Sequence, residues 1–292
     1  MTTYRIAAPA KINLGIEILG KRSDGYHEIR SILAAVDLVD TLTATPVPGA
    51  EATVVTGMDI SPEENLILRA LNAVDPRSAI RVAIEKRIPM AAGLGGASAD
   101  AAAALLIANA YRTNPLAKTD LHRLAAGLGS DVPFFLGGPC AHVSGTGTET
   151  VAVAPPAGFA VLFTPSIEIP RKTAALYGSL ESGDFSDGER IATQRSRLDE
   201  GRELEPALLA NAFSRALESL APPIVDLKRA ARDAGAPFVA LSGAGPSHYT
   251  IMSTEDDANA LASRWSRFLP PDVAIHVAAF RATPLQLDVV AR

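Results

Sequence analysis

The sequence has few of the residues that form cross-links and most metal sites. Cys140 is the only cysteine among 292 residues, which excludes an internal disulfide and a cysteine-rich zinc site. Its place beside Gly137 and Gly138 favours a small core residue. The five histidines show no HExxH or related metal spacing, and no G-x-S-x-G segment occurs. Zinc hydrolysis and serine hydrolysis therefore lose support.

Excess positive charge and long apolar runs are also missing. The formal net charge of -5 and the pI near 5.6 argue against a surface that neutralises nucleic-acid phosphates or anionic lipid. No apolar run reaches 18 residues, and residues 1–10 resemble neither a signal peptide nor a transit peptide. We expect a cytoplasmic protein without nucleic-acid or membrane partners, acting as a monomer or weak homodimer.

Strand and helix patterns mix irregularly along the chain, which predicts an α+β layer structure. Pro155-Pro156 marks the expected boundary between two domains, 1–155 and 156–292. The segment from Ser61 to Glu64 reads as a capping box that opens a helix, residues 145–147 as a hairpin turn, and residues 183–203 as a mobile loop or linker. Strands are predicted at 12–18, 41–45, 52–56, 80–84, 159–163, 238–241, 249–252 and 273–279, and helices at 97–108, 207–220, 224–234 and 255–268.

A glycine-rich loop leads directly into the Ala-rich helix and is the strongest local signal. Glycines let backbone N–H groups approach an anion, and a helix N-terminus adds unpaired donors. Phosphate is the natural ligand, although a purely structural turn is the alternative. Ser98 is placed to cap the helix, to ligate magnesium, or both. The loop and its helix start comprise Pro89, Met90, Ala91, Ala92, Gly93, Leu94, Gly95, Gly96, Ala97, Ser98 and Ala99.

Three further segments place polar groups in unexpected surroundings. Lys11 and Asn13 project from one face of a strand, either into a site or into solvent. Asp131 stands between glycines and an aromatic run, either as a proton acceptor or as a cap or turn residue. The segment Ser242-Gly243-Ala244-Gly245 follows an apolar strand, and its backbone is suited to bind phosphate or to permit close packing.

In this order, the segments resemble the GHMP kinases, which share an N-terminal substrate motif, a central glycine loop and a C-terminal S-G-x-G motif. The residues 9–14, 21–28, 64–66, 129–134 and 242–246 resemble the branch that phosphorylates 4-diphosphocytidyl-2-C-methyl-D-erythritol. The resemblance implies two domains, one like ribosomal protein S5 domain 2 and one ferredoxin-like, with the active site in the cleft between them. It also implies an ATP-dependent kinase of isoprenoid precursor synthesis.

The resemblance also implies roles for individual residues. Asp131 would accept the proton of the substrate hydroxyl, and Lys11 would orient that hydroxyl and offset its charge. ATP would lie on residues 89–99 with Mg²⁺ at its phosphates, where Ser98 is the candidate ligand, and Ser242, Gly243 and Gly245 would lie near the phosphates. The implied substrate residues are Asn13, Tyr26, His27, Thr173 and Tyr177, with His27 at the edge of the cytosine, Tyr26 beside it and Tyr177 over the ring. The segment 169–173, which ends at Thr173 and precedes Tyr177, is longer here than in the family.

Two other readings remain at this point. A mevalonate- or homoserine-type kinase or a mevalonate diphosphate decarboxylase would share the loop and the carboxylate but would not need the cytosine site. A nucleotide-binding relative without turnover would keep the fold alone, and the presence of Lys11, Ser98 and Asp131 together speaks against it.

Overall fold

Two long antiparallel strands form the centre of the larger sheet in the computed structural model, which describes residues 2–47, 53–76 and 79–290. β1 (Thr3–Lys21) and β2 (His27–Pro46) pair along nearly their whole length. The strand order is β11-β1-β2-β4-β3, and β5 pairs with β2 and β6. The other strands of this sheet are β3 (Val54–Thr56), β4 (Ile80–Glu85), β5 (Cys140–Ser144), β6 (Glu149–Ala152) and β11 (Leu287–Val290).

A second, antiparallel sheet has the order β10-β7-β9-β8. Helix α9 (Glu255–Phe268) packs on it through Trp265, which is fully buried and donates from its indole nitrogen to the carbonyl of Ala231 at 3.0 Å. Thr254 caps this helix by accepting from the Asp257 N–H. The strands are β7 (Phe159–Thr164), β8 (Ala240–Leu241), β9 (His248–Met252) and β10 (Ala274–Ala279).

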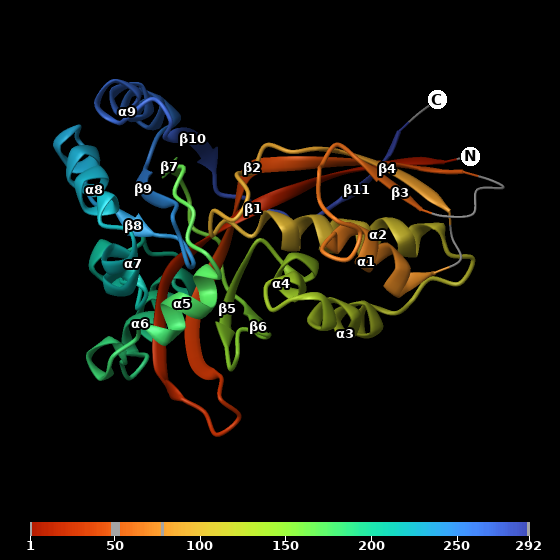
Figure 1. Cartoon of the computed structure of the whole chain (residues 1–292), viewed down its shortest axis with the longest axis horizontal. Helices are drawn as coiled ribbons and strands as arrows, with labels where there is room; N and C mark the ends of the chain where they lie inside the picture. The colour runs from red at the N-terminus through yellow and green to blue at the C-terminus, as the bar shows by residue number, and fades with distance from the viewer. Residues whose placement is uncertain (1, 48–52, 77–78, 291–292) are drawn as a thin grey trace.

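The helices form two groups (Figure 1). α1 (Leu66–Val74), α2 (Gly96–Tyr111), α3 (Lys118–Leu128) and α4 (Val132–Gly137) lie on one face of the larger sheet. The others are α5 (Lys172–Gly178), α6 (Glu189–Asp199), α7 (Ser214–Leu220), α8 (Pro223–Asp233) and α9, with short 3₁₀ turns η1 (Ser182–Asp184) and η2 (Pro206–Leu208). Within the described ranges, none of these helices combines the length and apolar character that a membrane crossing needs.

Helix α2 is the centre of the larger core, as the Ala-rich segment predicts. Its residues 101–104 are all alanine and fully buried. Small side chains let the helix backbone approach its neighbours closely, so α2 packs against both α1 and β1. Cys140 is a buried core residue, as expected, and burial raises the pKa of its thiol to about 12.

Two local predictions are wrong. The first helix begins at Leu66, where the Asn65 side chain accepts from the Leu68 N–H at 3.1 Å. In the expected capping pair, the Ser61 hydroxyl donates to the Glu64 carboxylate instead of capping the helix. Residues 183–203 are not a loop, because they contain η1 and α6. The first residue of the predicted strand 52–56, Ala52, lies outside the described residues.

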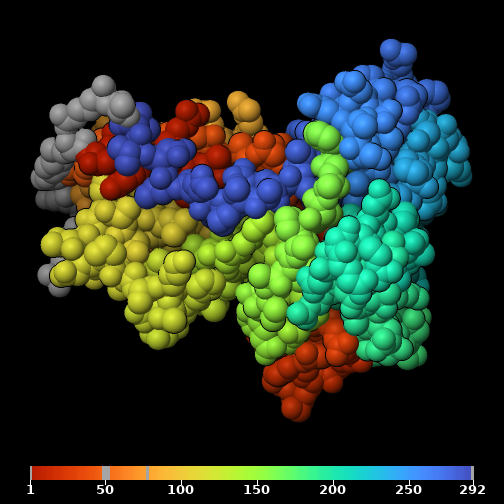
Figure 2. All heavy atoms as spheres, turned by 180° about the vertical axis from the view of Figure 1, so that it is seen from behind, coloured from red at the N-terminus to blue at the C-terminus, as the bar shows by residue number. Residues whose placement is uncertain are grey.

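The chain end returns to the first sheet. β11 pairs antiparallel with the start of β1, in the register Thr3 to Val290. Figure 2 shows this segment, in blue, crossing from the C-terminal layer to the N-terminal strands. The predicted hairpin at 145–147 joins β5 and β6, whereas the boundary near residue 155 stays a prediction.

Candidate active site

The glycine loop has a backbone shape suited to anions. Ala91, Gly93 and Gly95 have φ values of 52°, 81° and 72°, so every second residue is left-handed. Alternation of right- and left-handed residues turns successive N–H groups toward one point and forms a nest for an anion. Gly95 then begins α2 without a side-chain cap, which leaves the first-turn N–H groups without intrahelical partners. The alternative that Ser98 caps the helix is therefore wrong.

Protein groups bind the carbonyls of this loop one after another. The Lys11 N–H donates to Leu94 O at 2.8 Å, the Ser242 hydroxyl to Gly93 O at 3.1 Å, and the Ser247 N–H to Ala92 O at 3.1 Å. The carbonyl of Ala91 accepts from the Lys172 ammonium. With these carbonyls bonded to protein, the loop presents its N–H groups rather than its oxygens to a ligand.

The two glycine motifs lie directly against each other, although about 150 residues separate them. A Cβ on Gly93 would lie 2.5 Å from the Ser242 carbonyl oxygen. A Cβ on Gly243 would lie 2.8 Å from the Gly93 carbonyl oxygen and 3.2 Å from the Lys11 Nζ. The C-terminal motif is thus placed by close backbone packing, and it borders the Lys11 ammonium.

Lys11 is held from behind by polar groups in the interior. Its ammonium donates to the Asn13 Oδ1 at 2.7 Å, the Asn13 Nδ2 donates to the Ser31 hydroxyl at 2.8 Å, and that hydroxyl donates to the Gly15 carbonyl at 2.7 Å. Lys11 and Asn13 are 4% and 5% exposed. The solvent-facing alternative is wrong, because β1 is buried on both faces.

Asp131 faces Lys11 across the mouth of this site. Its Oδ2 lies 3.4 Å from the Lys11 Nζ, and a third of its side chain is exposed. Asp131 occupies the N-cap position of α4, yet its side chain makes no capping hydrogen bond. The carboxylate is therefore available to a ligand, and the structure brings together the two residues that the sequence singles out for proton transfer.

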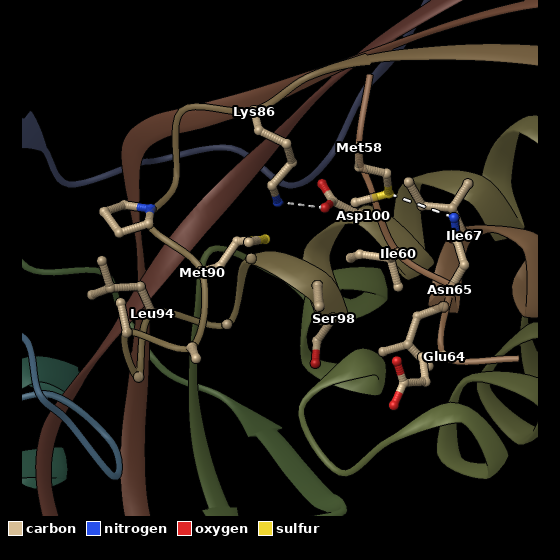
Figure 3. Close-up of a pocket in the computed structure, with 18 residues that line it drawn as sticks. Met58, Ile60, Glu64, Asn65, Ile67, Lys86, Met90, Leu94, Ser98 and Asp100 are labelled. Carbon is tan, nitrogen blue, oxygen red and sulfur yellow. Dashed lines mark hydrogen bonds and ion pairs between the residues drawn. The ribbon is translucent and has the colours of Figure 1, made fainter. Parts of the chain in front are cut away.

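The glycine loop borders two cavities. One, of about 320 Å³, is lined by Met58, Asn65 and Lys86 together with residues 89–98; Figure 3 shows Ser98 projecting from the start of α2. Ala99, included in the sequence prediction, is instead fully buried in the core. The second cavity, of about 680 Å³, is lined by Lys11, Ala91, Gly93, Gly95, Asp131, Ile169, Arg171, Lys172, Thr173, Ala174 and Ala244.

A buried charge cluster supports the first cavity. The Lys86 ammonium lies 2.5 Å from an Asp40 carboxylate oxygen and 2.7 Å from one of Asp100 (Figure 3 shows the second contact). The N–H groups of Arg87 and Ile88 donate to the other Asp40 oxygen. Burial, with the charge of Asp40, raises the pKa of Asp100 to about 7, although Lys86 acts in the opposite direction. The cluster fixes the strand end that leads into the glycine loop.

The predicted base-binding residues converge in part. The His27 and Tyr177 rings stack with centroids 4.8 Å apart. Phe185, which the sequence analysis missed, lies 6.2 Å from His27. Burial and then the charge of Asp131 raise the pKa of Tyr177. Tyr26, the residue before His27, is 67% exposed.

Comparison with known proteins shows which protein families match this chain. The family model for the GHMP kinases N terminal domain matches residues 65–138, and that for GHMP kinases C terminal matches residues 178–271. The chain is 35% identical over 260 residues to a 4-diphosphocytidyl-2-C-methyl-D-erythritol kinase of Dehalococcoides mccartyi, covering 87% of this chain and 90% of the relative. The same named enzyme of Geobacter sulfurreducens is 34% identical over 265 residues, with 88% and 93% covered.

Solved structures agree with these matches. A crystal structure of 4-(cytidine 5'-diphospho)-2C-methyl-D-erythritol kinase superimposes with a TM-score of 0.78 at 30% identity, covering 94% of this chain and 99% of that one. A homoserine kinase from Cytophaga hutchinsonii superimposes with a TM-score of 0.74 at 19% identity, covering 99% and 97%, and shares the fold. The predicted two-part GHMP kinase fold is confirmed.

Proposed function

The chain belongs to the 4-diphosphocytidyl-2-C-methyl-D-erythritol kinases within the GHMP kinase family, and we propose that it catalyses the reaction for which its relatives are named. ATP phosphorylates the 2-hydroxyl of 4-diphosphocytidyl-2-C-methyl-D-erythritol and gives the 2-phosphate and ADP. This reaction belongs to the methylerythritol phosphate route to isoprenoid precursors.

The observation that carries the proposal is the 3.4 Å pair of Lys11 and Asp131 beside the anion nest. The Asp131 carboxylate takes the proton as the hydroxyl oxygen forms its bond to phosphorus and the bond to the ADP oxygen breaks. The Lys11 ammonium, held by Asn13, offsets the negative charge that develops. Phosphoryl transfer needs mainly such positioning and charge stabilisation.

We assign the nucleotide to the smaller cavity and its phosphates to the nest formed by residues 91–95. The cavity wall of Met58, Ile60 and Leu66 suits an apolar base face. Mg²⁺ binds through few protein oxygens and several phosphate and water oxygens, and the Ser98 hydroxyl on this wall fits such a ligand. When bound, the ion offsets phosphate charge.

We assign the cytosine to the aromatic group around His27. Burial, and then the charge of Lys21, lowers the pKa of His27, so near pH 7 the ring is neutral, with one donor and one acceptor nitrogen. A neutral imidazole suits the mixed donor and acceptor edge of a pyrimidine. Tyr177 offers a ring face for stacking. Tyr26 is the exposed aromatic next to His27 in the sequence, and Thr173 lines the cavity that contains Lys11 and Asp131.

The test is phosphoryl transfer from [γ-³²P]ATP with magnesium to the cytidine acceptor, run beside mevalonate, mevalonate diphosphate, homoserine and galactose. We expect label only on the cytidine compound. Label on another acceptor would keep the kinase chemistry and reject the cytosine assignment. Release of CO₂ from mevalonate diphosphate would favour the decarboxylase, and no turnover with any compound would favour a nucleotide-binding relative.

A further inference from the structure

Lys172 connects three parts of the site that are far apart in the sequence. It is the first residue of α5, and its ammonium donates to the carbonyls of Ala91 in the glycine loop and Gly245 in the C-terminal motif. It also lines the larger cavity with Lys11 and Asp131. The sequence analysis assigned no role to this lysine.

The local backbone is shaped to bring this lysine to the loop. Arg171, which precedes α5, has a left-handed φ of 46°, and Ala91 has one of 52°; in the described ranges these are the two non-glycine residues of this kind. Such conformations persist where the surrounding structure holds them, and they cluster at functional sites. Lys172 connects these two residues, because it directly follows Arg171 and its ammonium donates to the carbonyl of Ala91.

The surroundings of Lys172 give it a charge without a counterion. Among residues 2–47, 53–76 and 79–290, no carboxylate forms an ion pair with it. Burial and then the charge of Lys11 lower the pKa of Lys172 to about 8. The ionisable groups that line the cavity are Lys11, Arg171, Lys172 and Asp131, so three cations face one carboxylate.

The two hydrogen bonds of the Lys172 ammonium leave one of its N–H donors unused. A lysine ammonium has three N–H donors, and the carbonyls of Ala91 and Gly245 take two of them. The third is available on the side of the cavity, where Lys11 repels it. An anion between the two ammonium groups would remove this repulsion and gain a charge-assisted hydrogen bond. A chain of net charge -5 thus concentrates positive charge at the point of phosphoryl transfer.

We propose that Lys172 is a further phosphate-binding residue of the kinase site, and that its ammonium contacts the γ-phosphoryl group of ATP as that group moves toward the acceptor hydroxyl. The proposal rests on the proposed function for the acceptor, but the ATP contact is tested without one. Lys172 would bind a phosphate oxygen, and both the γ-phosphate of ATP and the diphosphate of the acceptor offer one. The experiment must therefore distinguish ATP from the acceptor.

The binding experiment measures the affinities for ATP, ADP and 4-diphosphocytidyl-2-C-methyl-D-erythritol by titration calorimetry. The proteins are the unmodified chain, Lys172→Met, and Lys118→Met as a control that removes an equal charge from an exposed position at the start of α3. We expect Lys172→Met to weaken ATP about 10- to 100-fold, as for loss of a charged hydrogen bond, with ADP and the acceptor nearly unchanged. Lys118→Met should bind all three normally.

Two binding outcomes would overturn the proposal. Equal weakening of ATP and ADP would mean that Lys172 only ties the two glycine motifs together. Weakening of the acceptor alone would place the contact at the acceptor's diphosphate. If the chain binds ATP with this discrimination yet phosphorylates another acceptor, the proposed function fails while the role of Lys172 stands.

A second measurement uses Lys172→Arg and does not require Lys172→Met to fold. For the unmodified chain, we expect kcat/KM to fall above about pH 8, where Lys172 loses its proton. Because arginine stays protonated, Lys172→Arg should retain part of the activity and lose this basic limb. An unchanged basic limb in Lys172→Arg would refute the phosphate contact, because a merely structural tie has no reason to set the pH profile.

Discussion

Replacing Asp131 by asparagine is the sharpest test of the proposed chemistry, because it removes the proton acceptor and keeps the shape. General base catalysis contributes about 10²- to 10⁴-fold, so kcat should fall by that factor, which corresponds to about 3–5 kcal/mol of activation free energy. The fall should appear in kcat and kcat/KM alike, since the carboxylate acts on the reacting oxygen.

Stability should change little in Asp131→Asn. The ion pair spans 3.4 Å and the carboxylate is 33% exposed, so solvent screens it and its contribution is at most about 1 kcal/mol. Lys11 keeps its 2.7 Å hydrogen bond to Asn13. Removal of a negative charge near the phosphate nest should leave ATP affinity unchanged or slightly stronger.

The assay pairs ADP release with calorimetric ATP affinity and thermal unfolding. Asp120→Asn is the matched control, because it breaks an exposed ion pair of 3.0 Å with Arg123 at the start of α3, away from the site. The reasoning fails if Asp131→Asn keeps kcat within tenfold of the unmodified chain, or if ATP affinity and turnover are lost together, which would indicate a structural role.

The remaining predictions concern recognition, docking and pH. Tyr177→Leu removes the ring that stacks on His27 and should raise KM for the acceptor about tenfold with KM for ATP unchanged; equal effects on both would contradict the cytosine assignment. Glu17→Gln weakens the 2.8 Å bond that the buried Glu17 carboxylate accepts from the Ile191 N–H in the first turn of α6 and should speed proteolysis there without lowering ATP affinity. The pKa of Asp100 is raised to about 7 from an ordinary 3.8, so the folded chain binds the carboxyl proton more tightly than the unfolded chain does. The protonated Asp100 carboxyl therefore stabilises the fold below about pH 4, and this stabilisation is lost as pH rises through 7. In unfolding measurements from pH 5 to 7, the stability of Asp100→Asn should therefore increase relative to that of the unmodified chain by up to about 1.4 kcal/mol per pH unit; parallel curves would exclude a raised pKa of Asp100.

The parts that the sequence predicts well are those set by local chemistry. The glycine loop and α2 follow from glycine freedom and alanine propensity, and helix α9 matches its predicted range of 255–268. Lys11 and Asp131 stand out in the sequence as polar groups in unexpected surroundings, their roles follow from the resemblance to the GHMP kinases, and only the structure shows that they lie 3.4 Å apart.

The misses come from tertiary contacts. Lys172 escaped notice because its two partners are 81 and 73 residues away. Helix α6 has few apolar residues, and it is stabilised by burial of its own Ile191 and Gln194 side chains and by the bond that the Ile191 N–H donates to Glu17, which lies outside the helix. A distant carboxylate of this kind leaves no periodic signal in the sequence of the helix itself.

The shape of the glycine loop, to which we assign the phosphates of ATP, also follows from tertiary contacts, because the two halves of the chain build it together. Of the four groups that bind the carbonyls of residues 91–94, only Lys11 precedes residue 155; Lys172, Ser242 and Ser247 follow it. Each of these bonds fixes one peptide plane, and the direction of the N–H groups depends on all of them. A change in the C-terminal layer that displaces the segment 242–247 must therefore alter phosphate binding, even though the glycine loop itself lies in the N-terminal half.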